Sequence, residues 1–75
     1  MPYIAIKAYQ KDDAVKAKAV EKIMEILPEI WGCSREAITI SIEEYTPEEY
    51  KEKVLPEITP KMDKVWVLNG ENKVK

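Results

Sequence analysis

Two alternating segments, separated by a helical repeat, constrain the fold of this chain most strongly. Residues 3–9 and residues 37–43 each alternate apolar with other side chains, a pattern typical of a strand with one apolar side. The apolar sides are formed by Ile4, Ile6 and Ala8 in the first segment and by Ile38, Ile40 and Ile42 in the second. A strand, a helix and a second strand in this order predict a βαβ unit with parallel strands and a right-handed crossover.

The helix between the two strands has recognisable ends. Asp12 suits an N-cap, and Gly32 suits the residue that closes a helix. Asp12 and Lys16 are four residues apart, so we expect an ion pair that supports the first turn. Pro28 has no backbone N–H, and we expect it to kink the helix or to end its regular part.

A second helix is expected to begin after Thr46. Thr46, Pro47 and Glu49 have the spacing of a capping box with proline at the first helical position. Pro56 is expected to keep this helix short, and Thr59-Pro60 to start one further turn.

The end of the chain predicts a short strand or hairpin. Residues 65–68 read as a strand, and Asn69-Gly70 is a dipeptide typical of hairpin turns. The polar tail that follows is expected to form a weak second arm or to pair with a partner chain. We therefore expect residues 1–75 to form a single α+β domain.

Composition excludes several classes of function. The chain has 75 residues, 12 Lys and Arg, 14 Asp and Glu, no His and one Cys. Without His there is no imidazole base, no Ser-His-Asp triad and no Cys-His zinc site. The glutamates of the second helix are spread along its length, so we expect no metal site there. Only two glycines are present, too few for a glycine-rich phosphate-binding loop. The net charge of −2 argues against a nucleic-acid partner.

Small size predicts self-association. In a chain of this size, the free energy gained by burying apolar surface roughly equals the cost of ordering the chain, which is ~1.5 kcal/mol per residue. A homo-oligomer is therefore the expected source of further stability. No apolar run is long enough to span a membrane, and there is no secretory signal. With one free thiol, these features predict a cytoplasmic protein.

The candidate catalytic group is Pro2. Initiator methionine is generally removed before a small residue, and removal of Met1 would leave Pro2 as a free secondary amine. An α-amino group has an ordinary pKa of about 8, and a partly desolvated pocket lowers the pKa of an amine. Pro2 could then act as a general acid and base near neutral pH.

The chain resembles the 4-oxalocrotonate tautomerase superfamily over essentially its whole length. The resemblance lies in Pro2-Tyr3-Ile4-Ala5-Ile6-Lys7, Ile38-Thr39-Ile40-Ser41-Ile42, Thr46-Pro47-Glu48-Glu49-Tyr50 and Glu57-Ile58-Thr59-Pro60-Lys61-Met62. These segments are most similar to the longer bacterial branch that includes phenylpyruvate-type tautomerases. The resemblance implies a cofactor-free keto–enol tautomerase in which subunits join their sheets and share active sites. It favours a dimer, with a hexamer as the alternative.

The resemblance also implies positions for substrate-binding residues. Two arginines of the best-known members fall on Asp12 and Thr39, and the aromatic wall falls on Tyr50. Because guanidinium groups bind carboxylates bidentately, their loss favours a monocarboxylate or neutral enol over a dicarboxylate. Lys11 and Arg35 are the candidate replacements.

Each candidate also has a structural interpretation. Lys11 could be a solvated loop charge, Arg35 could pair with Glu29 or Glu36, and Tyr50 could be a core contact.

Two alternative functions remain open at this stage. One is an idle oligomeric scaffold or binding module on the same fold. The other is a related hydratase or decarboxylase, for which Glu43 and Asp12 are the nearest carboxylates.

Overall fold

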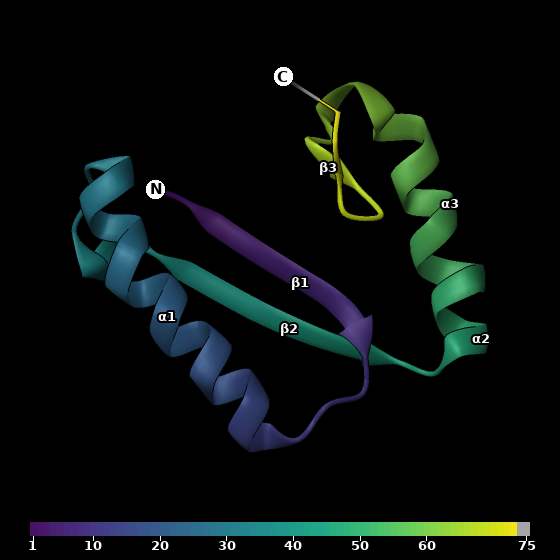
Figure 1. The fold of residues 1–75 in the computed structure, drawn as a ribbon, viewed down its shortest axis with the longest axis horizontal. Coiled ribbons are helices and arrows are strands. Elements are labelled where there is room, and N and C mark those ends of the chain that lie inside the picture. Colours follow the sequence, from purple (N-terminus) through teal and green to yellow (C-terminus); the bar gives the residue numbers. More distant parts are fainter. Residues whose placement is uncertain (74–75) are drawn as a thin grey trace. The chain divides into compact units, whose positions relative to one another are not determined.

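The computed structural model describes residues 1–73 of the chain. Their helices and strands give an α+β fold (Figure 1). The chain divides into two compact units, Met1–Tyr45 (unit 1) and the residues from Thr46 onward (unit 2). Each unit has its own set of elements.

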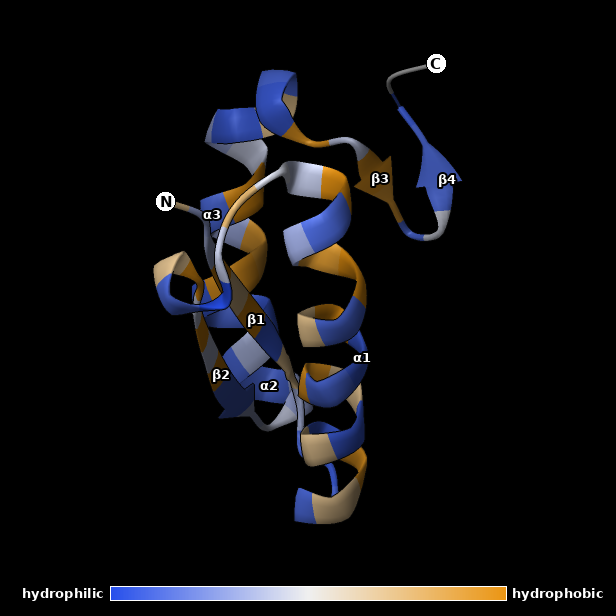
Figure 2. Ribbon diagram, turned by 90° about the vertical axis from the view of Figure 1, so that its left-hand side faces the viewer, coloured by the Kyte–Doolittle hydropathy of each residue, from blue (hydrophilic) through white to orange (hydrophobic). Residues whose placement is uncertain are grey.

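Unit 1 is the predicted βαβ unit. Strand β1 (Tyr3–Tyr9), helix α1 (Asp13–Trp31), the 3₁₀ turn η1 (Arg35–Ala37) and strand β2 (Thr39–Tyr45) follow in this order. The strands pair in parallel, from Tyr3 opposite Thr39 to Tyr9 opposite Tyr45. Helix α1 lies along one side of this pair in Figures 1 and 2. The parallel pairing predicted from the strand–helix–strand order is confirmed.

Strand β2 begins two residues later than expected and also ends two residues later. The segment predicted at 37–43 is observed as Thr39–Tyr45. Ala37 belongs instead to η1, where its N–H donates to the carbonyl of Ser34 at 3.1 Å. At the other end, Glu44 and Tyr45 continue the strand because Ala8 and Tyr9 of β1 lie opposite them.

The apolar sides of the strands face α1, as predicted. A cavity of about 140 Å³ between them has Ile6, Ala8 and Ile42 on the strand side and Val15 and Ala19 on the helix side. No residue of unit 1 is buried to the extent of Val54 in unit 2. Within residues 1–73, Val54 alone is buried, at 4% exposed, and no side chain is completely buried. Unit 1 therefore has a thin core, with every side chain still partly in contact with solvent.

Helix α1 has the predicted ends but not the predicted first-turn ion pair. Asp12 occupies the N-cap position without a side-chain cap bond, and Gly32 closes the helix with a φ of 74°. Lys16 pairs with Asp13 at 3.0 Å rather than with Asp12, because Glu44 of β2 also draws its ammonium, at 2.9 Å. Pro28 is contained within the helix, which continues to Trp31.

Unit 2 opens with a helical segment that is longer than predicted. It comprises α2 (Pro47–Glu49), the π-helical turn η2 (Tyr50–Val54), α3 (Leu55–Ile58) and the 3₁₀ turn η3 (Thr59–Lys64). Thr46 and Glu49 form the predicted capping box, with bonds of 3.1 and 2.9 Å.

Pro56 does not end this helical segment. At the end of η2 the N–H of Leu55 donates to the carbonyl of Tyr50, which makes this turn wider than an α-helical turn. Pro56 then falls in the first turn of α3, where the backbone N–H that proline lacks is not required. Thr59-Pro60 then starts the further turn that the sequence predicted.

The predicted hairpin is present in unit 2. Strands β3 (Val67–Leu68) and β4 (Glu71–Asn72) pair antiparallel. Asn69 and Gly70 link them with φ values of 49° and 83°, the left-handed conformations that such a turn requires. Figure 2 shows β3 as hydrophobic and β4 as hydrophilic. The final two positions of the predicted second arm, 74 and 75, lie outside the described residues.

Candidate functional site

Pro2 is held at the start of the parallel sheet. Its carbonyl accepts a hydrogen bond of 3.1 Å from the N–H of Thr39, and the residue is half-buried. This bond joins the residue before β1 to the first residue of β2. Two of the predicted site residues, Pro2 and Thr39, therefore lie side by side.

Two hydroxyl groups lie near the start of the strands on the outer sheet face, the face that points away from α1. The hydroxyls of Tyr3 and Ser41 lie 2.9 Å apart in a hydrogen bond, and Tyr3 is 64% exposed. Lys7 and Glu43 form an ion pair of 3.9 Å further along the same face. The hydrogen-bonded side chains at the start of this face are thus uncharged, and Glu43, further along the strand, is paired with the ammonium of Lys7.

Lys11 lies at the opposite end of β1 from Pro2. Strand β1 has seven residues, which at ~3.3 Å per residue separates its ends by about 20 Å. Lys11 and Pro2 of the same chain therefore cannot contact one small substrate together.

The backbone of Lys11 belongs to a polar cluster that fastens the β1–α1 turn to β2. Its N–H donates to one carboxylate oxygen of Glu44 at 2.8 Å, and the ammonium of Lys16 donates to the other at 2.9 Å. These two bonds lower the pKa of the Glu44 carboxyl, the backbone bond most of all. Hydrogen bonds from Lys16 to Glu44 and Asp13 raise the pKa of the Lys16 ammonium. The cluster is well suited to structural support.

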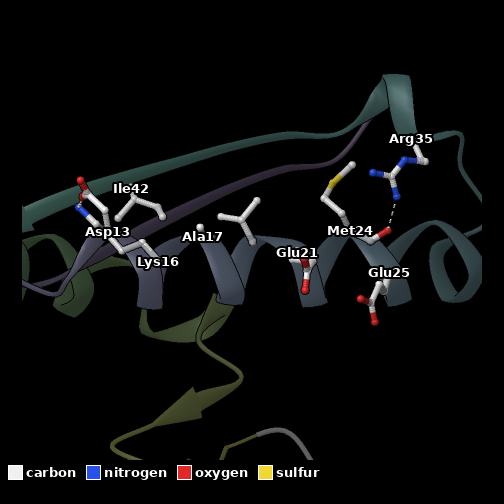
Figure 3. Close-up of a pocket in the computed structure, with 9 residues that line it drawn as sticks. Asp13, Lys16, Ala17, Glu21, Met24, Glu25, Arg35 and Ile42 are labelled. Carbon is white, nitrogen blue, oxygen red and sulfur yellow. Dashed lines mark hydrogen bonds and ion pairs between the residues drawn. The ribbon is translucent and has the colours of Figure 1, made fainter.

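Arg35 is turned toward α1. Its Nη1 donates to the backbone carbonyl of Met24 at 2.9 Å, in place of the ion pair with Glu29 or Glu36 considered from the sequence. Figure 3 shows this bond at one end of an open groove of about 690 Å³ beside α1 and β2. The floor of the groove is apolar and includes Ala17, Val20, Met24 and Ile42.

Tyr50 lines an apolar cavity within unit 2. The cavity measures about 490 Å³ and is lined by Leu55, Ile58, Met62, Val65 and Leu68 among others. Tyr50 begins the π-helical turn η2, a type of distortion that is frequent at functional sites. The sequence indicated an aromatic wall at Tyr50 but not this turn. Pro56 is the signal that could have revealed it, because a regular helix needs an N–H at that position.

The described residues offer no metal site and no membrane helix. Within residues 1–73, no three His, Cys, Asp or Glu side chains converge to hold a metal ion. In the same range, no helix is both long and apolar enough to cross a bilayer.

Comparison with known proteins adds no family assignment. The chain matches no protein-family model, and no curated protein is significantly similar to it.

Proposed function

We propose that this protein is a cofactor-free tautomerase in which Pro2, freed by removal of Met1, is the general acid and base. The observation that carries the proposal is the bond from the Thr39 N–H to the Pro2 carbonyl. It fixes the first residue of the mature chain while leaving its nitrogen outside the backbone hydrogen-bond network. A terminal amine fixed in this way is positioned for proton transfer.

The chemistry requires only that one proton changes place. The Pro2 nitrogen accepts the proton from the enol oxygen. The resulting ammonium donates a proton to the far carbon of the enol C=C bond, while the carbon that bears the oxygen becomes the carbonyl carbon of the ketone. A partly desolvated pocket around the freed Pro2 amine would favour its neutral form, because the charged form loses solvation. No redox step and no group transfer is needed, and Pro2 takes the acid–base role that an imidazole often plays, in a chain that has no histidine.

The substrate class that fits best is a small α-keto acid or its enol with at most one carboxylate. Tyr3, Thr39 and Ser41 supply hydroxyls at the start of the two paired strands, where the resemblance would place a guanidinium group at Thr39. Lys11 could provide a cation to the Pro2 site only from a second subunit, because it lies at the far end of β1. Resemblance to the 4-oxalocrotonate tautomerase superfamily supports the same reaction type.

We further propose that the protein is a homo-oligomer, and we favour a dimer over a hexamer. Tyr3 and Tyr9 on the outer face of β1 are 64% and 53% exposed, and unit 1 has no fully buried residue. Covering these apolar rings with a second subunit would add the burial that a chain of this size needs. A small-molecule substrate is the other expected partner.

An idle scaffold on the same fold is the second candidate. The groove and the small cavity described for unit 1 lie beside α1 and not at Pro2. If Met1 is retained, the Pro2 nitrogen is an amide and cannot act as a base. A hydratase or decarboxylase is less well supported, because Glu43 is paired with Lys7 and Asp12 lies at the far end of β1.

Two synthetic chains would test the proposal directly. Residues 2–75 carry a free Pro2 amine, whereas residues 1–75 carry the same fold with an amide at that nitrogen. With phenylenolpyruvate as the probe, we expect the shorter chain to catalyse ketonisation and the longer one to lose roughly 10²–10⁴-fold, the usual contribution of a general acid–base group. Intact mass of the protein from its native cells should lack one methionine residue.

The outcomes separate the candidates. Equal activity of the two chains would exclude the Pro2 amine as the base. No activity in either chain, or retention of Met1 in the native protein, would favour the scaffold. Circular dichroism of both chains serves as the control for folding.

A further inference from the structure

Pro28 leaves one carbonyl of α1 without its normal donor. In a regular helix the N–H of residue 28 would donate to the carbonyl of residue 24, but proline has no N–H. Arg35 fills this position, because its Nη1 donates to the Met24 carbonyl at 2.9 Å. Figure 3 shows the guanidinium beside that carbonyl, while the side chains of Glu21 and Glu25 point away from the strands.

The segment that carries Arg35 connects α1 to the Pro2 site. Gly32 and Cys33 donate to the Pro28 carbonyl at 2.9 and 3.1 Å, which fixes the start of the segment on the end of α1. The turn η1 follows, and its last bond runs from the Ile38 N–H to the Arg35 carbonyl at 3.2 Å. The next residue, Thr39, donates to the Pro2 carbonyl.

We propose that Arg35 is a positioning residue that replaces the N–H missing at Pro28 and thereby fixes η1 and, through Thr39, Pro2. The coupling between Pro28, Arg35 and Thr39 follows from the contacts alone, and only its effect on catalysis rests on the proposed function. Arginine suits this role because its charge persists at all physiological pH values and it has several N–H donors in a rigid plane.

If this is right, Arg35 is needed to fix η1 and Thr39 only while residue 28 is proline. In a Pro28→Ala chain, the new N–H can donate to Met24 and the guanidinium becomes dispensable. Four chains test this: the original, Pro28→Ala, Arg35→Met and the double variant. Lys22→Met is the matched control, because it removes one exposed cation of α1 whose partner is Glu25 at 3.4 Å.

Amide hydrogen exchange of Thr39, measured by NMR, is the primary readout. We expect Arg35→Met to speed exchange at Thr39 about tenfold relative to Ser41 of the same strand when Pro28 is present, as for loss of one hydrogen bond from a charged donor. The same change should have less than about a twofold effect in the Pro28→Ala background, and Lys22→Met should have none. Comparison with the exchange rate of Ser41 distinguishes local opening at Thr39 from unfolding of the whole strand, which would speed exchange at both residues.

If Arg35→Met speeds amide exchange at Thr39 equally with Pro28 and with Pro28→Ala, or in neither background, the proposal is overturned. Ketonisation of phenylenolpyruvate is the second readout, and Arg35→Met should lower kcat more than it raises KM, with recovery when Pro28→Ala is added. A rise in KM that Pro28→Ala does not relieve would mean that Arg35 binds substrate itself. If the exchange coupling is observed but no chain has activity, the positioning role stands and the tautomerase proposal fails.

Discussion

Val54 is the residue whose truncation should destabilise the chain most clearly. It is 4% exposed, and no other residue of the described chain is as well buried. Val54→Ala removes two carbons, worth about 1.6 kcal/mol in transfer free energy at ~0.8 kcal/mol each. The space left behind adds about 1 kcal/mol, and the better helix propensity of alanine returns about 0.5 kcal/mol. We therefore expect a loss of about 2 kcal/mol in the free energy of unfolding.

Val67→Ala is the matched control, because it removes the same two carbons from the same unit. Val67 is 55% exposed, so the expected loss is only about 0.7 kcal/mol. Urea unfolding at a fixed protomer concentration gives the free energy of unfolding of both variants. The change is taken from the shift of the urea midpoint, with the slope m of unfolding free energy against urea concentration held constant. If the two losses agree within about 0.5 kcal/mol, the reasoning that Val54 anchors unit 2 is wrong.

Two further predictions concern the polar contacts. Thr46→Ala should cost about 1 kcal/mol of unfolding free energy through loss of the N-cap; Thr59→Ala, which removes only a weak bond of 3.4 Å to the Leu55 carbonyl, should be near neutral in the same urea assay. The lowered pKa of Glu44 implies stability that is present above its ordinary pKa of 4.5 and is lost as the pH falls through the folded-state value. Glu44→Gln should therefore flatten the decline of the urea midpoint below pH 4.5, and an unchanged decline would refute this assignment.

Local signals in the sequence were reliable where the interaction itself is local. The Thr46 capping box, the closure of α1 at Gly32 and the Asn69-Gly70 turn all depend on residues within about one turn of each other. The alternation of isoleucine in the two strands likewise predicted which side would face α1, because successive side chains of a strand point to opposite faces.

Longer-range contacts could not be predicted in the same way. Lys16 was expected to pair with Asp12, but β2 brings Glu44 within 2.9 Å of its ammonium. The start of β2 moved to Thr39 because η1 occupies the preceding residues. Nothing in the local pattern around Arg35 indicates that its guanidinium would reach the Met24 carbonyl.

The sequence by itself determined the order of elements, the closure of α1 at Gly32, the capping box at Thr46 and the position of Pro2 directly before the first strand, because these follow from local backbone preferences and periodicity. Only the tertiary structure decided which groups surround Pro2. The parallel register brings Thr39 to its carbonyl, while the length of β1 takes Lys11 to the far end of the strand. Strand register and the return of a segment onto α1 are set by packing and by pairing of backbone groups distant in the chain, which local preferences do not encode.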